Sequence, residues 1–169
     1  MITVNSSKNF LLDIENSILA AGSCDKMIRV WCLRTTAPIT VLRGHNGIIT
    51  SIKFCPLLSD PEKRYLVSTS SDASVCFWEY NPKIRIFKDS PIKFDEKKKS
   101  TSQVLATSFS AGGVFLAAGA SDCYIHVYHV SAPAGPTKIL EIEEHSDQVD
   151  SILFSHHSMR FASGSKVIF

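Results

Sequence analysis

The chain has 169 residues, of which 44% are hydrophobic and 20% charged, and its formal net charge is +2. This length suits one ordinary domain with an apolar core, and the charge balance excludes a strongly basic nucleic-acid arm or an acidic disordered tail. No run of about 18 apolar residues predicts a transmembrane helix, and the N-terminus has no signal-peptide pattern. The five cysteines form no C-x-x-C pair, which favours a reducing compartment.

One type of segment recurs three times along the chain. LAAGSCDKMIRVW (Leu19–Trp31), LVSTSSDASVCFW (Leu66–Trp78) and LAAGASDCYIHVY (Leu116–Tyr128) align without gaps, at offsets of 47 and 50 residues. In each copy an aspartate precedes an aromatic residue by six positions. Each copy predicts a β-hairpin, because a small or apolar run is followed by a Ser/Asp turn and then by an alternating strand.

Further strands are predicted on both sides of these hairpins. In chain order they cover residues 39–42, 48–54, 92–94, 104–109, 138–142 and 149–154. No segment has a convincing helical period. Four strands repeated every 40 to 50 residues or so predict the blade of a β-propeller, so the expected fold class is all-β.

The residues at the ends of the repeat resemble the WD40 family. Gly44-His45 opens a repeat, and Trp78-Glu79 stands where Trp-Asp usually closes one. Four strings also resemble the N-terminal propeller of the bromodomain-and-WD-repeat proteins, the family of the pleckstrin-homology-domain-interacting protein. They are Leu19–Thr35, Arg64–Trp78, Ser108–Gly119 and His145–Ser155. The resemblance implies a partial propeller of about three and a half four-stranded blades.

The expected blades divide the chain into four parts. They are an incomplete first blade (1–43), a second blade with a long basic connection (44–99), a third blade (100–144) and a truncated fourth blade (145–169). Propellers have four to eight blades, and bare sheet edges invite aggregation. The chain is therefore expected to be a fragment. An early-ending isoform and a half-propeller that pairs with a second copy are the alternatives.

The WD40 resemblance implies a buried network in a blade, which links a histidine, a strand hydroxyl, the turn aspartate and the tryptophan. The second blade carries a full set: His45, Ser70 (with Ser68 as the alternative hydroxyl), Asp72 and Trp78. Such a network holds a blade only if every member is hydrogen-bonded. We therefore assign these residues a structural role.

The other blades depart from this set. Their candidate members are Ser23, Asp25 and Trp31 in the first blade, Asp122 and Tyr128 in the third, and His145, Ser163 and Ser165 in the fourth. The first blade has no preceding histidine. In the third, Ala120 replaces the hydroxyl and no Gly-His pair precedes the repeat.

Catalysis and metal binding are not predicted. His45, Ser70 and Asp72 are the residue types of a hydrolase triad, but acyl transfer needs an exposed nucleophile and an oxyanion hole, and no G-x-S-x-G elbow is present. An odd offset places His126 and His129 on opposite faces of a strand, whereas zinc needs three or four clustered ligands. We expect no catalytic residue, no cofactor and no metal.

Two basic features are candidates for binding. The run Asp95–Lys99 is expected to be a solvated loop, with a weak nuclear-import or nucleic-acid patch as the alternative. The WD40 proteins that act as substrate receptors of cullin-RING ubiquitin ligases resemble one another in a short sequence motif, here called the box, which ends in W-D-x-R. Asp25, Trp31 and Arg34 fit this box, although Cys32 replaces its acidic residue. A planar guanidinium suits such an interface. An ordinary exposed arginine is the alternative interpretation of Arg34.

The resemblance implies a non-enzymatic protein-interaction scaffold. It would belong to a nuclear, chromatin-associated protein with downstream bromodomains, which acts in transcription and cell-shape control. A cytoplasmic location is the alternative. Its partners would be proteins, among them a cullin-RING ligase adaptor, and neither nucleic acid nor membrane is expected. A nonfunctional truncation product and a propeller-based hydrolase are the alternative functions.

Overall fold

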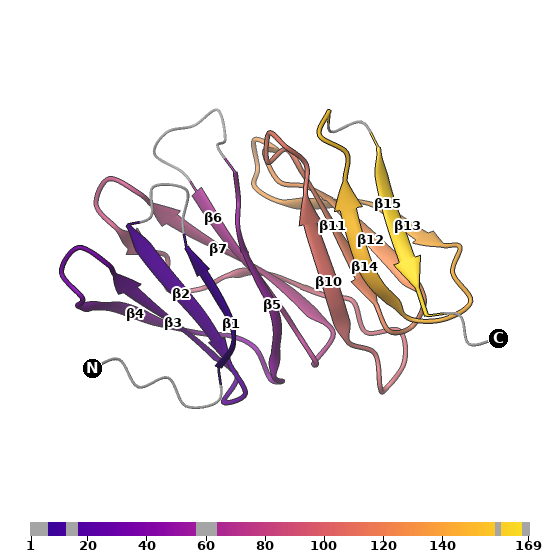
Figure 1. Ribbon diagram of the computed structural model, residues 1–169, viewed down its shortest axis with the longest axis horizontal. Coiled ribbons are helices and arrows are strands. Elements are labelled where there is room, and N and C mark those ends of the chain that lie inside the picture. The colour runs from indigo at the N-terminus through magenta and orange to yellow at the C-terminus, as the bar shows by residue number, and fades with distance from the viewer. Residues whose placement is uncertain (1–6, 13–16, 57–63, 158–159, 167–169) are drawn as a thin grey trace.

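The computed structural model describes residues 7–12, 17–56, 64–157 and 160–166. These residues form antiparallel sheets that lie side by side in chain order (Figure 1). The first sheet consists of β1 (Ser7–Leu12), β2 (Ile18–Ser23), β3 (Met27–Cys32) and β4 (Pro38–Arg43).

The other sheets repeat this order. The second consists of β5 (Ile49–Phe54), β6 (Arg64–Ser70) and β7 (Ser74–Asn81), and β7 also pairs with β8 (Ile86–Phe87) and β9 (Ile92–Asp95). The third consists of β10 (Val104–Phe109), β11 (Phe115–Ala120), β12 (Tyr124–His129) and β13 (Thr137–Glu143). A last pair, β14 (Val149–Phe154) and β15 (Phe161–Ser165), forms a two-stranded sheet.

The all-β prediction and its partial propeller blades are therefore confirmed. All the predicted strands are present within a residue or two of their expected bounds. Within the described residues, three strands were not predicted, namely β1, the short β8 and β15. The described residues include no helix of the length and apolarity needed to cross a membrane.

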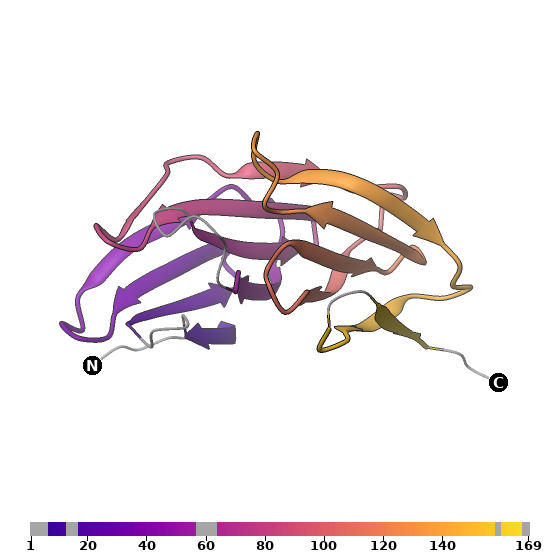
Figure 2. The same cartoon turned by 90° about the horizontal axis from the view of Figure 1, so that it is seen from above.

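The sheets are arranged in an arc, seen from above in Figure 2. Successive inner strands touch one another: β5 contacts both β1 and β10, and β10 contacts β14. Each sheet packs against the next sheet along the chain, so a central blade is covered on both of its faces. This explains why β6, with every residue buried, lacks the apolar–polar alternation of a half-exposed strand.

Apolar clusters fill the spaces between blades. Leu66 and Trp78 belong to the cluster between the first and second blades. Val67 and Phe77, which are adjacent in sequence to Leu66 and Trp78, belong to the cluster between the second and third blades. Alternate side chains of one strand therefore support two different interfaces, as the period of two requires.

Two glycines allow the inner strand of the next blade to pass closely. A Cβ atom on Gly22 would lie 2.5 Å from Cγ2 of Ile49, and one on Gly119 would lie 2.6 Å from Cγ1 of Val149. Both values are shorter than any van der Waals contact. The equivalent glycines of LAAGS and LAAGA are thus a packing requirement between blades rather than a feature of the hairpins.

Candidate functional site

The second blade holds a continuous buried hydrogen-bond network. Trp78 Nε1 donates to Ser68 Oγ at 2.8 Å, and Ser68 Oγ lies 2.7 Å from His45 Nε2. On the other side of the ring, His45 Nδ1 lies 2.7 Å from Ser74 Oγ, which donates to Asp72 Oδ1 at 2.5 Å. The network joins the connection after β4 to β6, to β7 and to the turn between them.

The hydrogen-bond directions fix the tautomer of His45. Since Ser74 donates its proton to the carboxylate, its oxygen accepts from an N–H at Nδ1 of His45. Nε2 is then the acceptor for the Ser68 hydroxyl, which in turn accepts from Trp78. Each polar atom along this path is satisfied, so the buried network stabilises the blade.

This geometry corrects one predicted member and adds another. The strand hydroxyl is Ser68 and not Ser70, whose Oγ instead accepts from the backbone N–H of Asp72 at 3.2 Å. Ser74, which was not predicted, stands between His45 and the aspartate. Pairing Leu66 with Trp78 places Ser68 two residues further along the strand, so the antiparallel register was the signal that would have found it.

Asp72 is held in its charged form. Burial raises the pKa of a carboxyl group, but hydrogen bonds from His45, from the hydroxyl and amide of Ser74 and from the amide of Asn46 outweigh it and hold the pKa of Asp72 far below its usual range. Asp72 also accepts from the Asn46 amide at 2.5 Å. The aspartate thereby anchors the loop that carries His45.

The buried position of this network does not suit acyl transfer. Ser68 is completely buried, and the side chain of His45 is 1% exposed. Ser68 already accepts from Trp78, and no substrate carbonyl can approach its oxygen from solvent. The geometry therefore supports the structural role of His45, Asp72 and Trp78.

The first blade has a surface turn in place of this network. Asp25 is exposed and pairs with Arg29 at 2.7 Å, while its backbone N–H donates to Ser23 Oγ at 3.3 Å. Trp31 is buried. Ala21 occupies the register position of Ser68, since Leu19 pairs with Trp31 as Leu66 pairs with Trp78. Ser23 therefore corresponds to Ser70, a turn residue, and not to the strand hydroxyl.

The third blade builds a different polar core. Asp122 accepts from Ser102 Oγ at 2.7 Å, and the Tyr128 hydroxyl donates to Glu96 Oε1 at 2.8 Å. By register, Ala118 occupies the position of Ser68 and Ala120 that of Ser70, so Ala118 is the residue that replaces the strand hydroxyl. Glu96, which follows β9, was not predicted, and its place at the start of a lysine run concealed its burial.

The last two strands repeat the core of the second blade in part. His145 Nε2 lies 2.7 Å from Ser163 Oγ. Ser163 pairs with Ile152, as Ser68 pairs with Ile52. The histidine–hydroxyl contact is therefore the same one in both blades. Ser165 lies at the register position of Ser70.

The lysine run is tied to the third blade. Lys98 pairs with Glu141 at 2.7 Å and lies 5.3 Å above the ring of Tyr124. The amide of Lys99 donates to Ser102 at 2.8 Å. The expected solvated loop is therefore wrong for Asp95, which ends β9, and for Glu96, which is buried, whereas residues 97–99 are exposed as expected.

Arg34 lies in the exposed turn between β3 and β4. Leu33, Arg34 and Thr35 are all exposed. Next to this turn, Arg85 Nη1 donates to the sulfur of Cys32 at 3.0 Å. This contact places the hairpin of β7 and β8 beside the end of β3, so the turn of the first blade and the hairpin of the second share one part of the surface.

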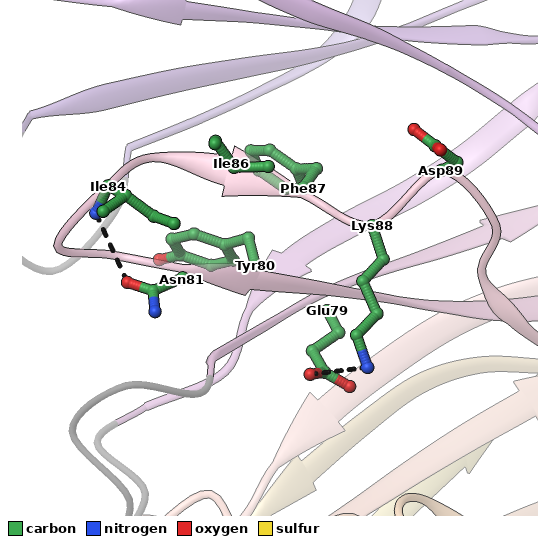
Figure 3. A pocket seen from close by; sticks show the side chains of 8 residues that line it. All are labelled: Glu79, Tyr80, Asn81, Ile84, Ile86, Phe87, Lys88 and Asp89. Carbon is green, nitrogen blue, oxygen red and sulfur yellow. Dashed lines mark hydrogen bonds and ion pairs between the residues drawn. The ribbon is translucent and has the colours of Figure 1, made fainter.

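A shallow groove of about 460 Å³ follows the β7–β8 hairpin (Figure 3). Tyr80 and Phe87 stack in it with ring centroids 4.8 Å apart, while Ile84 and Ile86 are each 63% exposed. Lys88, which follows β8, pairs with Glu79 of β7 at 2.9 Å. The β7–β8 hairpin therefore presents two apolar side chains to solvent beside this groove.

Comparison with known proteins gives the chain its family. Residues 4–32, 36–79 and 94–129 match the WD40 family, described as "WD domain, G-beta repeat". The chain is 33% identical to the Periodic tryptophan protein 2 homolog of Dictyostelium discoideum over 71% of its own length and 12% of the relative's. It is 26% identical to the Denticleless protein homolog of Gallus gallus over 84% of its length and 20% of the relative's.

A third relative is the DDB1- and CUL4-associated factor 13 of Dictyostelium discoideum. Its identity is 27% over 56% of this chain and 21% of the relative. The chain thus spans between about an eighth and a fifth of the length of these three relatives. The repeated hairpins, the blade order and the His–Ser–Asp–Trp network agree with the family match, and the chain belongs to the WD40 repeat family of protein-interaction scaffolds.

Proposed function

We propose that this chain is the part of a scaffold protein that docks the ligase adaptor DDB1 through the surface around Arg34. The observation that carries the proposal is the exposed turn at 33–35, next to the apolar hairpin of β7 and β8. A relative of this chain is named as a DDB1- and CUL4-associated factor. The box around Trp31 and Arg34 resembles that of cullin-RING substrate receptors.

The chemistry of this surface suits a protein partner. The guanidinium of Arg34 can bind carboxylate or carbonyl oxygens in two places at once. Ile84 and Ile86 offer apolar area close by, and Leu33 is also exposed. Arginine is one of the residue types that carry most of the binding energy at protein interfaces.

The setting of the whole protein is a further part of the proposal. The resemblance to the bromodomain-and-WD-repeat proteins supports a nuclear, chromatin-associated protein that acts in transcription and cell-shape control. Reading of acetyl-lysine would belong to bromodomains in the rest of that protein. This chain would contribute a docking surface, and no reaction is assigned to it.

Binding to purified DDB1 tests the proposal. We expect Arg34→Ala to weaken the complex at least about fivefold, which corresponds to about 1 kcal/mol. Arg43→Ala is the matched control, because Arg43 is also an exposed arginine of the first blade and lies at the far end of β4. Equal affinities of the Arg34→Ala and Arg43→Ala variants, or no binding by the unmodified protein, would contradict the proposal.

A further inference from the structure

Four ionisable side chains meet at the outer part of the third blade. Glu96 follows β9 of the second blade, His126 lies on β12, and Lys138 and Glu141 lie on β13. The side chains of His126 and Glu96 are 0% and 3% exposed, whereas those of Lys138 and Glu141 are 34% and 29% exposed. The cluster is therefore buried at one end and open to solvent at the other.

The imidazole of His126 faces two carboxylates without a hydrogen bond. Its Nδ1 lies 3.3 Å from Glu96 Oε2 and 3.4 Å from Glu141 Oε2. Within the described residues, neither ring nitrogen has a hydrogen-bond partner. A buried ring nitrogen without a hydrogen-bond partner is costly, and here it lies beside two carboxylate oxygens that can act as metal ligands.

Imidazole binds metal ions in its uncharged form, through a ring nitrogen that is not already engaged in a hydrogen bond. Within the described residues, both ring nitrogens of His126 meet the second condition.

We propose that Glu96, His126 and Glu141 form a binding site for a divalent cation of the zinc type. Their donor atoms lie within 4.8 Å of one another. Two donors that are each about 2.1 Å from a tetrahedral ion lie about 3.4 Å apart, which matches both distances from His126 Nδ1. A set of one imidazole and two carboxylates suits zinc and its neighbours in the first transition row. This proposal departs from the expectation of no metal that the sequence gives.

Neighbouring groups orient both carboxylates toward the site. The Tyr128 hydroxyl donates to Glu96 Oε1 at 2.8 Å, and Lys98 binds Glu141 Oε1 at 2.7 Å. In each case the second oxygen, Oε2, is the one that faces His126. Such outer contacts are what holds ligands in position in metal sites.

Lys138 competes for the place of the ion. Its Nζ lies 2.7 Å from Glu96 Oε2 and 3.1 Å from Glu141 Oε2. An incoming ion must displace this ammonium, and the partly exposed lysine side chain has a path to solvent. Removal of the Lys138 charge is therefore expected to strengthen metal binding, which a purely structural ion cluster would not predict.

A bound ion would fasten two blades together. Glu96 belongs to the connection that leaves the second blade, and its amide donates to the carbonyl of Ala73 at 2.9 Å. His126 and Glu141 belong to the third blade. This inference rests on the cluster alone and is independent of binding at Arg34.

Calorimetric titration of the chain with Zn²⁺ tests the proposal. The visible absorption of bound Co²⁺ tests whether the site is tetrahedral. The variants are made in a His156→Gln/His157→Gln background, because these exposed rings lie 5.5 Å apart and would bind zinc at the surface. We expect one ion per chain. Glu141→Gln and His126→Gln should each weaken binding at least about tenfold, and Lys138→Met should strengthen it by a similar factor.

His129→Gln is the matched control and should leave the affinity unchanged. His129 lies on the same strand as His126, and its Nε2 is 3.2 Å from Ser131 Oγ, away from the cluster. Glu141 is partly exposed, so its variant should remain folded if His126→Gln does not. Absence of one-to-one binding, or binding that neither Glu141→Gln nor Lys138→Met changes, would overturn the proposal.

Discussion

Trp78 and Tyr128 occupy the same position in successive blades but donate their hydrogen bonds in different directions. The indole N–H of Trp78 donates to Ser68 within its own sheet, whereas the hydroxyl of Tyr128 donates to Glu96 on the connection from the preceding blade. The same position of the repeat therefore supports a hydrogen-bond network inside the second blade. In the third blade it supports a hydrogen bond to a carboxylate of the preceding blade.

Ser68→Ala is expected to destabilise the protein by about 2–6 kcal/mol. The change leaves Trp78 Nε1 and His45 Nε2 buried without a partner, and each such group costs about 1–3 kcal/mol. Ser70→Ala is the matched control, since Ser70 is equally buried but accepts only the turn amide of Asp72, and it should cost about 1 kcal/mol or less. Urea unfolding measures both variants. Equal losses would show that the strand hydroxyl has been assigned to the wrong serine.

Asp72 should make the protein sensitive to acid. The pKa of Asp72 is lower in the folded chain than the unfolded value of about 3.9, so its contribution to stability is complete above that pH and decreases as the pH falls. The decrease is at most about 1.4 kcal/mol per pH unit. Asp72→Asn should therefore cost less at pH 3 than at pH 7, as measured by urea unfolding. A difference in unfolding free energy that does not change with pH would contradict this assignment.

Tyr128→Phe should destabilise the third blade by about 1–3 kcal/mol, because it removes a donor from a buried carboxylate oxygen. Burial and the nearby Glu96 raise the pKa of Tyr128, so its hydroxyl keeps its proton. A double-mutant cycle measures the coupling between the two side chains. It compares the free energies of unfolding of Tyr128→Phe, Glu96→Gln and the double variant. Additive effects would mean that the hydrogen bond contributes nothing to stability.

The cysteines should differ strongly in their rates of alkylation. Burial raises the pKa of Cys55 and of Cys76 to about 12, so few of these thiols are ionised at pH 8. Cys24 and Cys123 are partly exposed beside the turn aspartates. Peptide mapping after iodoacetamide treatment should show Cys55 and Cys76 modified at least about a hundredfold more slowly than Cys24 and Cys123. Similar rates for all four would contradict the described packing.

The repeat made most of the fold predictable. An Asp turn and an aromatic residue at constant spacing predicted the hairpins, and the period of the repeat predicted four-stranded blades. The position of the strand hydroxyl was less accessible, because Ser68, Ser70 and Ser71 are all hydroxyl residues of one short segment and only the strand register separates them. Ser68 and Ser70 lie on the same face of β6, so the choice between them depends on how β6 is aligned against β7.

The cluster of four ionisable side chains around Glu96 could not be predicted from local sequence. Its members come from residues 96, 126, 138 and 141, which become neighbours only when the second and third blades pack together. The odd offset of His126 and His129 correctly separated those two rings. It gave no information on the carboxylates that another blade and another strand bring to His126.

Hydrogen–deuterium exchange of the chain with and without DDB1 tests the proposed docking surface most directly. Slower exchange is expected in the turn at 33–37 and in the hairpin at 82–88, because both lie around Arg34 and the contact between Cys32 and Arg85. The connection at 97–103, which is tied to the third blade, should exchange at its original rate. Protection confined to that connection, or no protection in either segment, would contradict a docking surface at Arg34.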